Sequence, residues 1–175
     1  MSEKVSKQKV FLATPAYEGK VHVEFVNSLV STLMAAHANN IEVSYSIYAN
    51  SGSIPRVRNQ AVATFLAGDY TDLFFVDADM GWNAEDFVRL LRYDTSVVGA
   101  AYPARTDKNA RWIVVWPDEI KQHEVGLLTA RRAGTGFLRV RRDAIETLVE
   151  KHADLKFNAP HGNTKENEFT YALFD

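Results

Sequence analysis

The 175-residue chain contains no cysteine. This absence excludes disulfide bonds, thiol nucleophiles and zinc sites built on cysteine. The chain also lacks any apolar run near the ~20 residues that a membrane-spanning helix needs, and its polar N-terminus, MSEKVSKQKV, has no apolar core of signal-peptide length. We therefore expect a soluble, cytoplasmic protein without an integral membrane segment.

The chain also lacks a large excess of either sign of charge, because the formal net charge is −2 at pH 7 and the sequence pI is near 6.2. This balance argues against broad electrostatic binding of nucleic acid and against a polybasic membrane anchor. The composition, 46% hydrophobic and 24% charged, is that of an ordinary globular protein. We expect one domain over residues 1–175, in which residues 1–8 form a loose leader.

Strand and helix patterns alternate along the first hundred residues, which predicts an open α/β sheet with right-handed crossovers. The run Leu73-Phe74-Phe75-Val76 shows no alternation, as is typical of a central parallel strand covered on both faces. The predicted strands are 10–14, 41–48, 73–76 and 96–101, and the predicted helices are 21–37, 57–66 and one that begins after Asn83.

The first helix and the second half of the chain carry further expectations. In helix 21–37 the helical spacing of Val26, Leu29, Val30, Leu33 and Met34 predicts a buried face, with Asn27, Ser28, Ser31 and Thr32 on the other. Beyond residue 101 the predicted strands 112–116, 125–128, 137–140 and 169–174 and the predicted helix 143–152 no longer alternate regularly. An antiparallel second half attached to a mostly parallel first half is the simplest interpretation.

Two aspartates, Asp77 and Asp79, directly follow the most hydrophobic strand. Ligands of an open α/β sheet bind beyond the carboxyl ends of its strands, and residues i and i+2 point to the same side. Two neighbouring carboxylates repel each other, and a divalent cation relieves that repulsion. Oxygen ligands suit Mg²⁺ or Mn²⁺ holding a diphosphate. The alternative is a pair of solvent-facing aspartates in a turn.

The segment around these aspartates, Leu73-Phe74-Phe75-Val76-Asp77-Ala78-Asp79-Met80, resembles the Asp-x-Asp segment of glycosyltransferases with the GT-A fold. Four other segments agree with that family in order. They are Thr14-Pro15-Ala16-Tyr17, Ile54-Pro55-Arg56-Val57-Arg58-Asn59, Val98-Gly99-Ala100-Ala101-Tyr102-Pro103 and Ala133-Gly134-Thr135-Gly136-Phe137. The resemblance covers roughly residues 9 to 148 and is closest to small, family-2-like members of viral or bacterial type.

The resemblance implies a GT-A-like open, mostly parallel sheet with helices on both faces, and glycosyl transfer from a nucleotide-diphosphate sugar. It implies that Asp79, with Asp77, holds Mn²⁺ or Mg²⁺ against the diphosphate, and that Asp77 alternatively contacts the ribose. Donor contacts are implied for Pro15, Ala16, Tyr17, Arg58, Asn59, Asp77, Gly134, Thr135 and Gly136.

Several of these residues have alternative interpretations that need no ligand. Arg58 either contacts the phosphates or forms a salt bridge on the helix surface. Tyr17 either stacks on the base or is a loop aromatic. Gly134 and Gly136 suit close approach of a ligand or a tight turn between strands. His161 is a candidate third metal ligand, although no motif surrounds it.

The acceptor half of the predicted site is poorly marked. An inverting enzyme needs a carboxylate base to deprotonate an acceptor hydroxyl, and the candidates are Asp175, Glu166 and Glu168. The acceptor is an unidentified glycan, lipid or protein. We therefore expect a truncated or minimal domain, and the main alternative is a non-catalytic module that binds sugar nucleotides.

Two other enzyme classes fit the sequence less well. A sugar-nucleotidyltransferase needs a Gly-rich, basic phosphate loop after its first strand, where this chain has Thr14-Pro15-Ala16-Tyr17. A phosphatase with an aspartate nucleophile would carry its Asp-x-Asp after the first strand, whereas here it follows the third.

Overall fold

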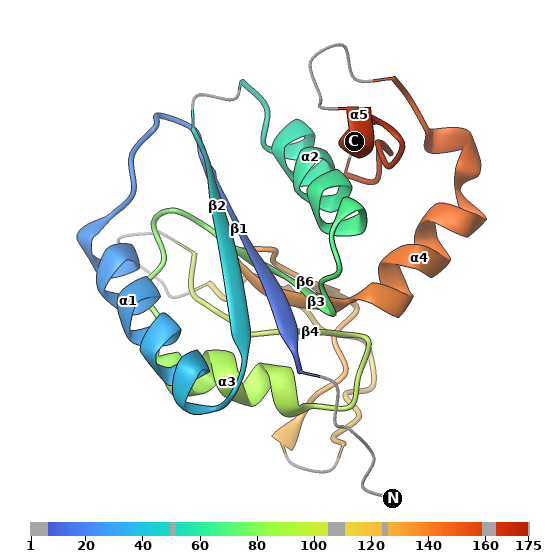
Figure 1. The fold of residues 1–175 in the computed structure, drawn as a ribbon. Coiled ribbons are helices and arrows are strands. Elements are labelled where there is room, and N and C mark those ends of the chain that lie inside the picture. The colour runs from blue at the N-terminus through green and yellow to red at the C-terminus, as the bar shows by residue number, and fades with distance from the viewer. Residues whose placement is uncertain (1–6, 50–51, 105–110, 124–125, 159–163, 175) are drawn as a thin grey trace, which may run out of the picture.

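The computed structural model describes residues 7–49, 52–104, 111–123, 126–158 and 164–174. Its centre is a five-stranded mixed sheet with the strand order β2-β1-β3-β7-β4 (Figure 1). The strands are β1 (Lys9–Ala16), β2 (Glu42–Ala49), β3 (Asp72–Val76), β4 (Val97–Gly99) and β7 (Phe137–Arg141). A separate two-stranded sheet pairs β5 (Val114–Val115) with β6 (Arg132–Ala133).

Helices cover both faces of the main sheet. One face carries α1 (Val23–Ala38) and α3 (Ala84–Arg92), and the other carries α2 (Ile54–Ala67), α4 (Arg142–Lys151) and the short α5 (Thr164–Asn167) (Figure 1). A 3₁₀ turn, Ala153–Leu155, follows α4. Among the residues that the structure describes, no helix combines the length and apolar character needed to cross a membrane. The prediction of an α/β sheet covered by helices on both faces is confirmed.

Alternation along the strands separates the hydrophobic core into two layers. On the α1 and α3 face, Leu12 of β1 and Phe74 of β3 pack with Phe25 and Phe87. On the α2 and α4 face, the intervening strand residues pack with the apolar sides of those helices, and the buried members are Phe11, Ala13, Ala61, Val62, Phe65, Leu66, Leu73, Phe75, Val140 and Ile145. Because β3 is buried on both faces, it is the hydrophobic run without alternation that the sequence shows.

The second half of the chain adds antiparallel pairing to the parallel first half. Strands β1, β2 and β3 are parallel, but β7 inserts antiparallel between β3 and β4. Strand β4 therefore runs parallel to β3 without pairing with it, and the predicted antiparallel second half attached to a mostly parallel first half is confirmed. Across this pairing the buried guanidinium of Arg139 lies beside Asp72 of β3, with 3.4 Å between Nε and Oδ1.

Two predicted strands of the second half are not formed. Within the described part of segment 125–128, Leu128 makes only an isolated bridge to Gln122, and in segment 169–174 Tyr171 makes only a bridge to Lys156. The latter segment packs through its side chains instead. The Phe174 ring lies 5.5 Å from the Phe75 ring.

Helix α1 is rotated relative to its apolar pattern. Ser28 and Thr32 are buried, whereas Val26, Val30 and Met34 are exposed, so the predicted faces are wrong at these positions. The cause is Trp82, whose backbone N–H donates to Ser28 Oγ at 2.9 Å and whose indole Nε1–H donates to Thr32 Oγ1 at 2.8 Å. Trp82 is partly buried, and a polar group removed from water needs a hydrogen-bond partner, so these two polar residues satisfy both of its N–H donors.

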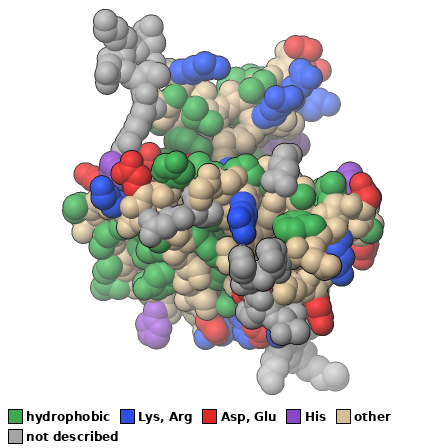
Figure 2. Space-filling model, turned by 90° about the horizontal axis from the view of Figure 1, so that it is seen from above, with side chains coloured by type: hydrophobic (Ala, Val, Ile, Leu, Met, Phe, Trp, Pro, Cys, Tyr) green, Lys and Arg blue, Asp and Glu red, His purple; other side chains and the backbone are tan. Residues whose placement is uncertain are grey.

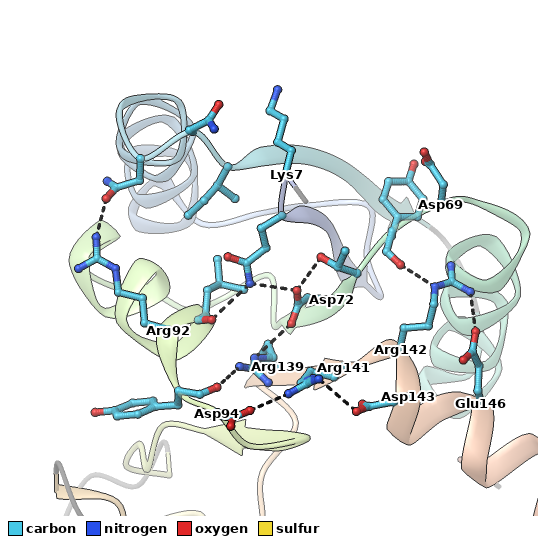
Figure 3. Close-up of a pocket in the computed structure, with 18 residues that line it drawn as sticks. Lys7, Asp69, Asp72, Arg92, Asp94, Arg139, Arg141, Arg142, Asp143 and Glu146 are labelled. Carbon is cyan, nitrogen blue, oxygen red and sulfur yellow. Dashed lines mark hydrogen bonds and ion pairs between the residues drawn. The ribbon is translucent and has the colours of Figure 1, made fainter. Parts of the chain in front are cut away.

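An open cleft of about 870 Å³ lies at the amino-terminal edge of β1 and β3 (Figure 3). Several of its charged groups pair with one another. Arg139 pairs with Asp72 and donates to the carbonyl oxygens of Tyr93 and Thr95, while Arg141 pairs with Asp94 and Asp143. This ionic network ties β3 and β7 to the chain that follows α3, at the sheet edge opposite Asp77.

Candidate functional site at the carboxyl ends of the strands

Asp77 leaves the sheet directly after β3, at the edge where ligands of α/β sheets bind. Its backbone N–H donates to the carbonyl oxygen of Gly136 at 3.0 Å, and its own carbonyl oxygen accepts from Met80 N–H at 3.1 Å. The first bond joins the end of β3 to the Gly-rich segment before β7, and the second closes the turn that contains Asp79. The position of Asp77 is therefore set by two parts of the chain far apart in sequence.

Arg58 of α2 is the ionic partner of Asp77. Its Nη2 donates to Asp77 Oδ1 at 3.3 Å, and the side chains of Arg58 and Asp77 are 16% and 35% exposed. Burial raises the pKa of Asp77, the positive charge of Arg58 opposes that rise, and the negative charge of Asp79 adds to it. The buried Nε of Arg58 has no hydrogen-bond acceptor among the described residues. Arg58 thus holds one oxygen of Asp77 and retains an unused donor.

Gly136 lies directly against the Asp77 carboxylate. A Cβ added to Gly136 would lie 2.7 Å from Asp77 Oδ2 and 2.6 Å from the hydroxyl oxygen of Tyr102. A Cβ added to Gly134 would lie 2.3 Å from the same hydroxyl. Both glycines are therefore needed for the close approach of the protein's own side chains, and the approach of a ligand to them stays a prediction. Thr135, between them, is half-buried.

Tyr102 is the residue at this site that sequence reasoning did not single out. Its hydroxyl oxygen accepts a hydrogen bond from Gly136 N–H at 2.9 Å. Burial raises the pKa of Tyr102, so the hydroxyl keeps its proton at neutral pH. The available signal was its position one residue beyond the predicted strand 96–101, because that strand ends at the same edge as β3.

Asp79 is exposed in the turn after Asp77. Both carboxylates provide the hard oxygen ligands that Mg²⁺ and Mn²⁺ prefer. Among the described residues, no group of three or more His, Cys, Asp or Glu side chains is placed to hold a metal ion. The pair alone fits a cation that takes its other ligands from substrate phosphates and water, as Mg²⁺ commonly does.

The other residues predicted to contact the sugar-nucleotide donor lie at the end of β1 and on α2. Pro15 and Ala16 end β1 in the interior, and Tyr17, which follows them, is 65% exposed. Asn59 is buried and its Oδ1 accepts a hydrogen bond from Phe174 N–H at 3.1 Å, so it holds residues 169–174 against α2. Figure 2 views the molecule from the end at which β1, β2 and β3 finish.

The structure describes only some of the residues predicted as the third metal ligand or as the acceptor base. His161 and Asp175 lie outside the described residues. Glu166 accepts a hydrogen bond from Thr64 Oγ1 at 3.1 Å, and Glu168 is exposed.

Comparison with known proteins identifies the fold. The solved structure of S. aureus TarS, residues 1–349, matches 95% of this chain with a TM-score of 0.50 and 18% sequence identity. The fold is GT-A-like. This chain spans 55% of that structure. A glycosyltransferase involved in the glycosylation of the major capsid of PBCV-1 matches 91% of this chain and 73% of its own, with a TM-score of 0.39 and 11% identity. Neither a protein-family model nor a curated protein sequence matches the chain.

The chain is thus similar in fold to S. aureus TarS. This similarity concerns the arrangement of helices and strands. In the GT-A-like fold of this chain, Asp77, Arg58, Tyr102 and the Gly134–Gly136 segment meet at the carboxyl edge of the sheet.

Proposed function

We propose that this chain binds a nucleotide-diphosphate sugar at the carboxyl edge of its sheet, with Mn²⁺ or Mg²⁺, and transfers the sugar to an acceptor hydroxyl. The observation that carries the proposal is the setting of Asp77. Arg58 holds one of its oxygens, Gly136 leaves space beside the other, and Asp79 follows in an exposed turn. The GT-A-like fold is consistent with such chemistry, although a fold alone does not determine function.

Each residue has a role in this proposal. Asp77 and Asp79 would hold the cation, which neutralises the charge that grows on the departing diphosphate. Arg58 keeps the Asp77 carboxylate oriented, and its free Nε–H offers a donor to a phosphate oxygen. The exposed ring of Tyr17, just beyond β1, offers a stacking surface for the nucleotide base.

A non-catalytic module that binds sugar nucleotides is the second candidate. One observation favours it: the carboxylate of Glu166, a candidate acceptor base, already accepts a hydrogen bond from Thr64 of α2. A base that deprotonates an acceptor must be within hydrogen-bond reach of the acceptor hydroxyl.

Thermal denaturation with a panel of nucleotide-diphosphate sugars, with and without Mn²⁺, tests donor binding. A ligand at 100 times its dissociation constant adds about 2.7 kcal/mol to the free energy of unfolding. We expect stabilisation by at least one donor that requires Mn²⁺ and disappears in Asp79→Asn. Asp154→Asn, at an exposed position after α4, is the matched control and should keep the response. The proposal is wrong if no donor stabilises the wild-type protein.

Release of the nucleoside diphosphate separates the two candidates. Mn²⁺-dependent release that Asp79→Asn abolishes supports the transferase. Metal-dependent donor binding without release, across glycan, lipid and protein acceptors, supports the binding module.

A further inference from the structure

Helix α1 exposes a stripe of large apolar side chains. Val23, Val26, Val30 and Met34 repeat every three or four residues and are 71%, 44%, 52% and 71% exposed. Ser28 and Thr32, which bind Trp82 at the start of the α3 region, lie on the opposite flank of the helix. The stripe therefore faces away from α3, on the side of α1 next to the free edge of the sheet. Figure 2 shows hydrophobic side chains gathered along this side of the molecule.

Strand β2 forms that free edge (Figure 1). It is eight residues long and, among the described strands, pairs only with β1. Tyr45 and Ile47 stand in register with Leu12 and Thr14 of β1, and Leu12 packs in the core layer beneath α1. Residues in register share a face of the sheet, so Tyr45 and Ile47 lie on the same face as the α1 stripe. They are 50% and 40% exposed.

The backbone of β2 is also available for pairing. The N–H of Glu42 donates to Gln8 O at 2.9 Å, toward β1. Because backbone groups alternate in direction along a strand, the N–H and C=O groups of Val43, Tyr45 and Ile47 point toward the free edge. A long, unprotected edge strand with apolar side chains is a template for a further strand. Neither proline nor lysine interrupts β2, whose sequence is EVSYSIYA.

We propose that the α1 stripe and the β2 edge are covered by a second copy of this chain, through antiparallel pairing of β2 with β2 about a two-fold axis. The odd-numbered residues carry both the outward backbone groups and the side chains on the α1 face. An axis beside Tyr45 therefore places Tyr45 opposite Tyr45 of its partner, and Val43 opposite Ile47, as hydrogen-bonded pairs. The same surface serves both protomers, as a two-fold interface requires. The five-stranded sheet then continues across the dimer, and the two α1 stripes meet on one face.

The exposed apolar area favours a second protein chain, rather than a lipid surface, as the partner. The six side chains expose on the order of 500 Å² of apolar surface, which is at the upper end for the largest apolar patch of a monomer. Strand pairing would bury further surface and bring the total closer to the ~800 Å² per partner of a standard interface. A lipid surface fits less well, because helices that bind anionic membranes carry Lys or Arg on their polar face. The sequence of α1, VEFVNSLVSTLMAAHA, contains neither.

Mass measurement by sedimentation equilibrium or light scattering is the first test. We expect the wild-type protein at twice its 19.7 kDa mass at micromolar concentrations. Val30→Glu and Ile47→Lys should each yield a folded monomer, since both residues are exposed. Leu148→Glu on α4 and Val97→Lys on the other edge strand, β4, are matched controls and should remain dimeric. A monomeric wild-type protein, or a dimer that persists in both test variants, overturns the proposal.

Cross-linking tests the register. Because the chain has no cysteine, Tyr45→Cys introduces a single thiol. Opposite residues of a hydrogen-bonded antiparallel pair have Cα atoms about 5.5 Å apart, within the range that a disulfide spans. Mild oxidation should convert this variant to a covalent dimer much faster than Leu148→Cys. Equal rates for the two variants, or co-flotation of the wild-type protein with anionic vesicles as a monomer, would contradict the two-fold β2 interface.

Discussion

The Asp77 carboxylate and the α-carbon of Gly136 lie so close that a Cβ on residue 136 would stand 2.7 Å from Asp77 Oδ2. The Asp77 backbone N–H also donates to the Gly136 carbonyl oxygen. The end of β3 and the Gly-rich segment before β7 therefore behave as one unit, and the shape of the proposed donor site depends on both.

Substitution of Gly136 should damage the site more than the fold. In Gly136→Ala, the new methyl group would press on the Asp77 carboxylate and the Tyr102 hydroxyl, so we expect loss of Mn²⁺-dependent donor binding and a free energy of unfolding lower by about 1–3 kcal/mol. Titration calorimetry and urea denaturation measure the two effects. Gly52→Ala is the control, since a Cβ there meets nothing within 4 Å. Unchanged donor binding in Gly136→Ala would show that ligands do not use this edge.

Asp77 should make stability depend on pH. Burial raises its pKa, with Arg58 opposing and Asp79 adding to the rise. The stability contributed by the protonated carboxyl group is fully present below its pKa in the unfolded chain, and is lost as pH rises through the higher pKa of the folded protein. Asp77→Asn avoids this loss. We expect its melting temperature to exceed that of the wild type at neutral pH and to match it at acid pH.

The control for that experiment is Asp154→Asn, whose carboxyl group is exposed. Its melting temperature should follow the wild-type curve at every pH. If Asp77→Asn is less stable than the wild type at neutral pH, the bond from Arg58 outweighs the burial of the carboxylate.

Breaking the ion pair of Asp72 and Arg139 should strongly lower the free energy of unfolding. Their side chains are 4% and 1% exposed (Figure 3). Arg139→Ala leaves Asp72 charged and buried, so we expect the free energy of unfolding to fall by about 3–5 kcal/mol. In Arg141→Ala, whose partners Asp94 and Asp143 are exposed, the loss should be about 0–1 kcal/mol. Urea denaturation compares them, and equal losses would contradict the buried role of Arg139.

Thr32 should be essential to α1 packing although it is polar. Thr32→Val keeps the shape of the side chain but leaves the Trp82 indole N–H without its acceptor, at an expected cost of about 1–3 kcal/mol. Ser31→Ala, its exposed neighbour, should change stability by about 0.5 kcal/mol or less. Unfolding in urea, followed by tryptophan fluorescence, measures both. A neutral Thr32→Val variant would mean that Trp82 finds another acceptor.

The elements of the first half were predictable because their signals are local. The apolar run of β3, the alternation in β2 and the glycine that ends α2 are set by burial and backbone preference within a few residues. The Asp-x-Asp turn was likewise predictable from its place after β3. The buried faces of α1 were not, because Ser28 and Thr32 are internal only through Trp82, some fifty residues away.

The sequence by itself determined an α/β chain with two aspartates at the end of its most buried strand, since hydrophobic periodicity and strand direction are properties of neighbouring residues. The tertiary structure decided that β7 inserts between β3 and β4 and that Arg58, Gly136 and Tyr102 surround Asp77. It also decided that β2 lies at an edge of the described sheet. These outcomes depend on which distant segments satisfy each other's buried charges and hydrogen bonds, and no local pattern specifies that choice.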